Sequence, residues 1–285
     1  MTGPASLPDY AELHALSNFS FQRGASHPAE LVERAQQLGY KALALTDECS
    51  VAGMVRAWRA AQACGLRLLP GSEFALQGPL RGLRVVALAR DLQAWGDLCE
   101  FISAARQRAP KGSYRVDESS PWQLLGGCEI LLAPSRELCG DASEAVAVRA
   151  LLEGATALFD AKNRGHLWLA VELHAAVDDS LWLQTLRQVG TALSLPLVAA
   201  GDVHMHARSR KPLQDVVTAI GRGLRVDECG WALQPQAERR LRSRARLAGL
   251  YPPELLAATL EVARRCRFDL GEIRYRYPLE TVLPG

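Results

Sequence analysis

The feature that most constrains the fold is a repeated alternation of short, continuous apolar runs with amphipathic stretches of helical length. The apolar runs predict strands at 42–46, 67–74, 84–89, 129–133, 167–173 and 196–200. The stretches between and before them predict helices at 28–38, 51–64, 92–106, 143–159 and 181–193. Strands that are apolar along their whole length and alternate with helices are typical of a parallel sheet covered by helices.

Polar residues lie at or just after the ends of several of these predicted strands. They are Asp47 and Glu48, Glu73, Glu172 and His174, and Asp202 and His204. In a parallel barrel the carboxyl ends of the strands share one face, and sites are built there. We therefore favour a closed (β/α) barrel over an open doubly wound sheet. No glycine-rich dinucleotide turn or Walker loop supports a nucleotide-binding fold.

Length and composition fit a single soluble barrel. The chain has 285 residues, of which 48% are hydrophobic and 22% charged, enough for one large core. A formal net charge of +2 does not by itself require a nucleic-acid surface. We expect neither a membrane span nor a signal peptide, because no apolar run has the length or the flanking charges. The seven cysteines form no Cys-x-x-Cys pair and predict reduced thiols rather than a zinc site.

The most informative candidate site is a metal-binding pattern that is only half present. Asp202 and His204 form an Asp-x-His pair after a predicted strand, and two such residues can bind one metal ion together. Near the N-terminus, His14 is followed at the same spacing by Leu16, which cannot bind a metal. The sequence therefore leaves two alternatives open. The chain either binds a metal and uses it in catalysis, or it keeps the fold without the metal chemistry.

Six short motifs carry a resemblance to a known family. They lie at 10–14 (YAELH), 17–21 (SNFSF), 24–26 (GAS), 45–47 (LTD), 71–73 (GSE) and 196–204 (PLVAAGDVH). Together they resemble the PHP domain (polymerase and histidinol phosphatase), and more closely the PHP domain that opens bacterial error-prone, C-family DNA polymerases. The resemblance implies a distorted seven-stranded (β/α) barrel over 1–270. It also implies a linker at 271–285 that leads toward an absent polymerase body.

In active members of that family, ligands at the strand ends hold divalent metals that activate water against a phosphate ester. Carried over by the resemblance, the ligand positions that keep a suitable residue are His14, Glu73, Asp202 and His204. The positions that depart from the family pattern are Leu16, Arg23, Glu48, Arg84 and Ser135. Arginine is permanently protonated and does not ligate metals, so the resemblance implies a degenerate site.

Two of the departures are arginines, and they suggest how the site is rewired. We predict that Arg23 and Arg84 form ion pairs with some of Glu48, Glu73 and Asp202, because acids at one barrel mouth need counter-ions without metals. We expect no cofactor in this domain. The alternative is one weakly bound zinc or manganese ion on His14, Asp202 and His204.

The leading functional hypothesis is a catalytically inactive, structural PHP domain of an error-prone polymerase that acts in translesion synthesis. The resemblance implies that the whole enzyme is a bacterial, cytoplasmic nucleotidyltransferase with magnesium in the polymerase body. Its implied partners are DNA, the sliding clamp and mutasome proteins, with no membrane partner. One alternative is a metal-dependent phosphoesterase or 3′–5′ proofreading exonuclease. The other is a DNA- or partner-binding module that uses the basic segment 238–246, for which a solvent-exposed helix face is the simpler prediction.

Overall fold

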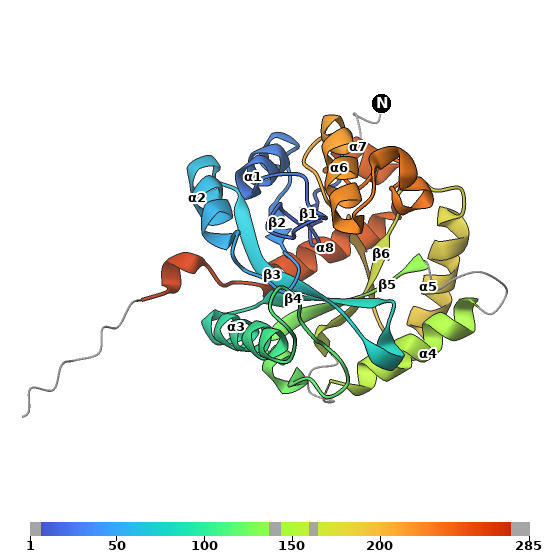
Figure 1. Cartoon of the computed structure of the whole chain (residues 1–285). Coiled ribbons are helices and arrows are strands. Elements are labelled where there is room, and N and C mark those ends of the chain that lie inside the picture. The colour runs from blue at the N-terminus through green and yellow to red at the C-terminus, as the bar shows by residue number, and fades with distance from the viewer. Residues whose placement is uncertain (1–6, 137–143, 160–164, 275–285) are drawn as a thin grey trace, which may run out of the picture.

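Seven strands close into a barrel in the computed structural model, which describes residues 7–136, 144–159 and 165–274 (Figure 1). Neighbouring strands follow chain order from β1 to β7. Their bounds are β1 Ala11–Glu12, β2 Ala42–Leu45, β3 Arg67–Ala75, β4 Leu83–Ala89, β5 Cys128–Pro134, β6 Leu167–Glu172 and β7 Leu197–Ala200. Beyond β1 and β7, Ala15 pairs with Val203 in parallel and brings the first and last strands together. The predicted seven-stranded barrel is confirmed.

Helices surround this barrel. Those between the strands are α1 Pro28–Gln37, α2 Met54–Cys64, α3 Leu92–Gln107, α4 Glu144–Ala157 and α5 Asp179–Leu193. After β7 come α6 Lys211–Arg222, α7 Arg244–Ala248 and α8 Pro253–Arg265. The first five match the predicted helices, whereas no bounds were predicted for β1 or for the last three helices. Local chemistry sets the helix starts: the Asp91 carboxylate, for example, caps α3 by accepting a hydrogen bond from the Ala94 amide at 2.8 Å.

Two apolar layers hold the barrel together. The outer layer lies between the strands and α1 to α5. The inner layer fills the barrel with small and aliphatic side chains such as Ala42 and Val198, and α8 adds Val262 and Ala263 to it. The hydroxyl of Thr259 on α8 accepts a hydrogen bond from the Ala11 amide at 3.2 Å. Helix α8 therefore closes the end of the barrel where the parallel strands begin (Figure 1).

The sheet is not parallel throughout, and here the sequence prediction is wrong. Strand β4 pairs antiparallel with both β3 and β5. The chain between β3 and β4 is a short turn in which Gly78 and Gly82 take positive φ values of 68° and 98°, too short for the crossover that a parallel pair needs. As a result, the start of β4 lies beside the end of β3, with Arg84 opposite Ala75.

The basic segment 238–246 also differs from the prediction of an exposed helix. Arg240 pairs with Met205 in a parallel bridge, and Glu238, Leu241 and Arg242 are buried. The Arg242 guanidinium donates to the Leu173 carbonyl at 2.6 Å, so the segment folds back across the ends of β6 and β7. Only its last residues enter a helix, α7.

The long loop predicted at 109–122 is present as irregular chain that ends at a short 3-10 helix, Trp122–Leu125. Most of the predicted linker lies outside the described residues, since 275–285 are not among them. None of the helices within the described ranges combines the length and hydropathy needed to cross a bilayer.

Candidate functional site: a charged barrel mouth

The carboxyl ends of the strands bring a set of charged side chains to the open end of the barrel. We call this set the mouth cluster, and it consists of His14, Arg23, Glu48, Glu73, Arg84, Glu172, Asp202, His204 and Arg239. Arg84 joins it because β4 runs antiparallel and therefore begins at this end.

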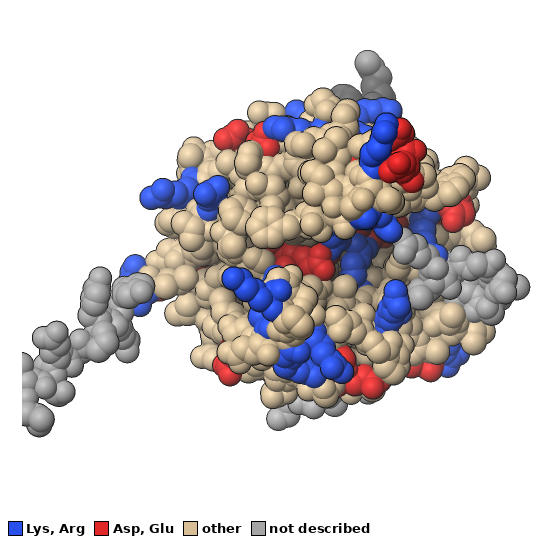
Figure 2. All heavy atoms as spheres, in the orientation of Figure 1, with Lys and Arg blue, Asp and Glu red and all other residues tan. Residues whose placement is uncertain are grey.

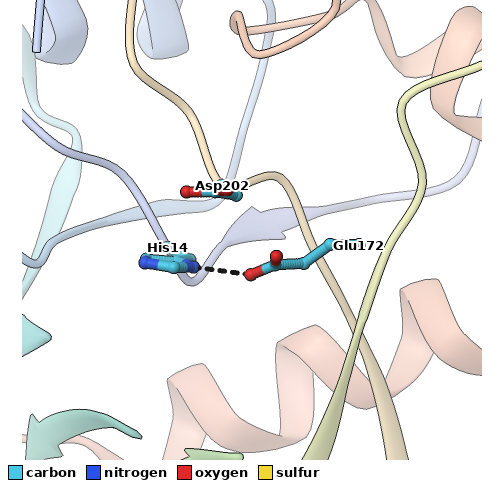
Figure 3. Close-up of side chains that lie close together, drawn as sticks. All are labelled: His14, Glu172 and Asp202. Atoms are coloured by element: carbon cyan, nitrogen blue, oxygen red, sulfur yellow. Dashed lines mark hydrogen bonds and ion pairs between the residues drawn. The ribbon is translucent and has the colours of Figure 1, made fainter. Parts of the chain in front are cut away.

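His14 lies at the centre of the mouth cluster and is fully buried. Its Nε2 is 2.6 Å from Glu73 Oε2, and its Nδ1 is 2.8 Å from Glu172 Oε1 (Figure 3). Burial by itself lowers the pKa of His14, but the hydrogen bonds to Glu172 and Glu73 outweigh burial and raise the pKa above its usual value. With a carboxylate at each ring nitrogen, His14 is therefore a protonated bridge that donates to both.

Arg23 pairs with two acids on the β2–β3 side of the mouth. Its Nη1 is 2.7 Å from Glu48 Oε2 and also contacts Glu73 Oε1. Burial opposes ionisation of Glu73, yet Arg23 and His14 hold the pKa of its carboxyl well below the usual range. The second Glu48 oxygen accepts a hydrogen bond from the Tyr114 hydroxyl at 2.7 Å. Arg23 and His14 thus keep Glu73 ionised in a fully buried position.

Arg84 links the ends of β6 and β7 across the mouth. Its Nη2 is 2.5 Å from Glu172 Oε2, and its Nη1 is 2.9 Å from Asp202 Oδ2. Burial opposes ionisation of Glu172, but Arg84 and His14 lower the pKa of this carboxyl to about 2. A guanidinium presents its donors in a fixed fork, which suits a bridge between two carboxylates.

Asp202 also contacts Arg239, which lies in the basic segment 238–246 and was not among the predicted site residues. The His204 amide donates to the Arg239 carbonyl at 2.9 Å, which anchors the returning segment 238–242 at the mouth. The ring of His204 places Nε2 3.0 Å from Asp202 Oδ1. Burial, with Arg23 and Arg84 nearby, holds the pKa of His204 well below its usual value.

Comparison with known families identifies this barrel. A family model described as the PHP domain matches residues 12–175, more than half of the chain. The chain belongs to the PHP domain family. The match begins at β1 and extends just beyond β6, and so includes most of the strands that carry the mouth cluster.

Relatives place this PHP domain in a larger context. The chain is 48% identical over 285 residues to a protein named error-prone DNA polymerase from Dechloromonas aromatica (strain RCB), covering 98% of the chain and 26% of that protein. It is 47% identical over 276 residues to a protein of the same name from Pseudomonas aeruginosa, covering 97% of the chain and 25% of that protein. The chain thus spans about a quarter of the length of the curated relatives it matches.

A solved structure agrees on the fold. An amidohydrolase from Chromobacterium violaceum, solved with bound sulfate and no metal, superposes with a TM-score of 0.52 at 16% identity. The match covers 68% of this chain and 87% of that one. At this identity the likeness concerns the fold alone.

Three residues of this PHP domain place ligand-type atoms as close together as in a metal site. Ligand-type atoms of His14, Glu172 and Asp202 lie within 4.8 Å of one another (Figure 3). Both His14 nitrogens already face carboxylates, and Arg84 contacts both Glu172 and Asp202. A dication would have to break the contact between His14 and Glu172 and stand beside the Arg84 guanidinium, which repels it. In this arrangement the trio does not fit a metal ion.

The structure brings the predicted positions of the PHP site to one end of the barrel. Leu16 is fully buried there and donates its amide to the Val203 carbonyl at 2.8 Å. Ser135 follows β5 and lines the cavity described below. Asp47 accepts hydrogen bonds at 2.7 Å from the amide and hydroxyl of Ser17.

Two residues of the mouth cluster were absent from the predicted site. Glu172 stands at a strand end, which the sequence already marked as polar, but the resemblance assigned it no ligand position. Arg239 arrives from a segment whose path only the tertiary structure reveals.

The mouth of the PHP barrel opens into a cavity of about 600 Å³. Its wall carries four arginines, Arg23, Arg81, Arg84 and Arg239, together with His204 and Ser135. Figure 2 shows a hollow on this face in which basic and acidic atoms lie side by side. The cavity is the solvent-facing side of the mouth cluster.

Proposed function

We propose that this chain is the N-terminal PHP domain of an error-prone DNA polymerase and that the domain is structural rather than catalytic. The two polymerase relatives support the first part, since the chain matches about a quarter of each. The observation that carries the second part is the Arg84 guanidinium bound between Glu172 and Asp202. Arg84 is a permanent cation that pairs with the two carboxylates a metal ion would bind. These carboxylates are therefore neutralised without a metal.

In this proposal the chemistry of the whole enzyme belongs to a polymerase body outside the chain. There, magnesium and carboxylates would transfer deoxynucleotides to a primer opposite damaged DNA in the bacterial cytoplasm. DNA, the sliding clamp and mutasome proteins would be partners of the whole enzyme. The PHP domain would contribute a rigid surface on which that body packs.

A stripe on α6 supports the packing role. Leu213, Val216, Ile220 and Leu224 follow one another at spacings of three or four residues and are between 42% and 65% exposed. Residues at such spacings share one side of a helix and its C-terminal end. Trp231 nearby in the sequence is 99% exposed. Exposed apolar side chains grouped in this way mark interaction surfaces, and we propose that the polymerase body covers this one.

A hydrolysis assay tests the absence of catalysis. The 285-residue chain is incubated with zinc or manganese and either a chromogenic phosphodiester or a primer labelled at its 5′ end. We expect no cleavage above the level of Asp202→Asn. Cleavage by the unaltered chain that disappears in Asp202→Asn would contradict the proposal.

A second experiment tests the packing role in the full-length polymerase. Ile220→Glu places a charge in the α6 stripe, whereas Val55→Glu places one on α2, where Val55 is similarly exposed at 57%. We expect Ile220→Glu to lower the melting temperature of the polymerase and Val55→Glu to leave it unchanged. Equal melting temperatures of the two variants would show that α6 does not belong to the packing surface.

The alternative function is a metal-dependent phosphoesterase or proofreading exonuclease, and the spacing of His14, Glu172 and Asp202 is the observation in its favour. It requires Arg84 to move away from two carboxylates when a metal binds. Calorimetry decides between the two functions: micromolar zinc or manganese binding that is lost in Asp202→Ala would favour the enzyme.

A further inference from the structure

Two consecutive residues in the loop between β1 and α1 connect helix α6 to the mouth cluster. Arg23 belongs to the mouth cluster, where its guanidinium pairs with Glu48 and Glu73. Gln22, its neighbour in the chain, packs instead against α6 at Gly221. The loop therefore contacts both the helix that carries the exposed apolar stripe and the acids at the barrel mouth.

The contact between Gln22 and α6 is close. A methyl group added at Gly221 would lie 2.9 Å from Cβ and 3.0 Å from Oε1 of Gln22. Carbon atoms in ordinary contact lie about 3.5–4.0 Å apart, so such a group would press on the loop. The Cβ atom is attached directly to the backbone and cannot swing aside as the end of a side chain can. A displacement of α6 toward the loop is therefore transmitted to the backbone at Gln22.

The loop is anchored on both sides of this contact. Before it, the Ser20 hydroxyl donates to the Asp47 carboxylate at 2.7 Å. After it, the Ala25 amide donates to the His204 carbonyl at 2.7 Å. The Arg23 amide donates to the Ser20 carbonyl at 3.1 Å, which closes the chain between the anchors into a turn. Because both ends are held, we expect the tip of this turn to move as one piece.

The guanidinium at the inner side of the turn holds a fully buried acid. Its Nη1 is 2.7 Å from Glu48 Oε2 and also contacts Oε1 of Glu73, which is 0% exposed. The other cation on Glu73 is His14. A buried ion is tolerated only while its partner is in place, so a shift of Arg23 changes the stability of the mouth cluster.

We propose that the loop at 18–24 is a conformational link through which a partner that packs on α6 controls the ion pairs of the mouth cluster. The link rests on the packing role proposed above, in which the polymerase body is this partner. A docked body fixes α6 against Gln22 and so holds Arg23 on its two acids. Without that support α6 shifts more easily, and Gln22 and Arg23 shift with it.

Gly221→Ala tests the link in the 285-residue chain, because the added methyl group presses on Gln22 as a displaced α6 would. We expect the guanidinium Nε–H signal of Arg23 in the NMR spectrum, assigned with Arg23→Lys, to shift in this variant. Gln22→Gly removes the side-chain atoms that the methyl group would meet, and glycine suits the φ of 66° at this position. Adding Gly221→Ala to Gln22→Gly should therefore leave the signal unchanged. Gly96→Ala on α3, where a methyl group meets no described atom within 4 Å, is the matched control and should not shift the signal.

A double-mutant cycle measures the same link as stability. The loss of unfolding free energy caused by Gly221→Ala should shrink by half or more in an Arg23→Gln background, because the ion pairs that it disturbs are already absent. The same cycle with Arg84→Gln, which removes a mouth arginine outside the loop, should be additive.

Three results would overturn the link. They are an Arg23 signal that Gly221→Ala leaves in place, additivity with Arg23→Gln, and equal coupling to both arginines, which would indicate general loosening of the domain. The NMR comparison needs no variant that removes a mouth charge other than the one used for assignment. Neither experiment involves the polymerase body, so a failed link leaves the packing role to be judged separately by Ile220→Glu.

Discussion

The two ends of the barrel each hold a histidine against a carboxylate and an arginine, but they are built differently. At the mouth, His14 bridges Glu73 and Glu172. At the opposite end, where β5 and β6 begin, His166 Nδ1 is 2.7 Å from Glu129 Oε1, and Arg90 Nη1 is 2.8 Å from His166 Nε2. The mouth thus concentrates several acids and cations, whereas the contacts at the opposite end centre on Glu129.

Glu129 at the closed end has an uncharged group among its hydrogen-bond donors. Glu129 Oε2 accepts a hydrogen bond from the Trp168 indole at 2.7 Å, and Arg90 Nε donates to the Gly127 carbonyl at 2.7 Å. Arg265, at the end of α8, approaches Glu129 only to 3.5 Å. Neutral donors satisfy a buried charge without adding a second one that must itself be desolvated.

The mouth depends instead on charge pairs. Each of its ions is expensive to bury, and each is tolerated only while its partner is in place. Removing one partner should therefore be far more costly at the mouth than at the closed end. The mouth also opens into a cavity, whereas α8 covers the closed end.

The largest expected effect comes from Arg84→Met, which removes the shared partner of Glu172 and Asp202. We expect a loss of up to about 3–5 kcal/mol in the free energy of unfolding, the usual cost of removing one partner from a buried ion pair, with His14 still paired to Glu172 and Arg239 to Asp202. Urea denaturation followed by circular dichroism measures it. The matched change at the closed end is Arg265→Met, where the arginine is 32% exposed, and we expect a loss of about 1 kcal/mol or less. Similar losses of stability in both variants would contradict the conclusion that the mouth depends more on charge pairs than the closed end does.

A smaller effect should follow acidification. The pKa values of Glu73 and Glu172 are depressed from 4.5, that of Glu172 to about 2. Their contribution to stability is therefore present above 4.5 and is lost as the pH falls through the folded-state pKa values. We expect the free energy of unfolding to drop by on the order of 1–3 kcal/mol between pH 4.5 and about 2. Glu172→Gln should remove part of this drop, and an unchanged profile in that variant would contradict the assignment.

The contribution of His14 to stability should depend on pH in the opposite direction. Its pKa is raised from 6.5, so its contribution is complete below 6.5 and is lost as the pH rises through the folded-state pKa. Unfolding measured from pH 6 upward should therefore show a fall in stability. His14→Gln keeps a hydrogen-bonding side chain without a titration in this range and should flatten that part of the profile. A fall of the same size in His14→Gln would assign the titration to another group.

The sequence predicts a site residue well when its position depends on neighbouring residues in the chain, and poorly when its position depends on distant contacts. Glu73, Asp202 and His204 lie at or just after the ends of strands whose apolar runs can be read directly, whereas His14 follows β1, which was not predicted, and was identified by its motif. Arg84 was a predicted site residue, but its strand was expected to run parallel. In a parallel strand its starting position would lie at the closed end. Only the short turn before β4 brings Arg84 to the mouth.

Arg239 could not be predicted because its position depends on long-range packing. The basic composition of 238–246 indicated an exposed helix, yet burial of Leu241 and Arg242 pulls the segment across the strand ends. The Arg242 guanidinium finds partners in the Leu173 carbonyl and the Tyr251 hydroxyl, which lie far away in the sequence. Charge patterning alone cannot distinguish a solvated cation from one that such partners bury.

The smallest expected effect is the response to a metal chelator. A metal that bound the folded chain would raise its melting temperature by mass action, and chelation would lower it. At the mouth, Arg23, Arg84 and Arg239 already neutralise the carboxylates that a metal would bind. We therefore expect the melting temperature to be the same with and without excess chelator, measured by differential scanning calorimetry after purification without added chelator. A fall of several degrees that zinc or manganese reverses would show that an ion, rather than the arginines, holds the strand ends together. The difference between the two ends of the barrel would then lie in a metal site rather than in charge pairs.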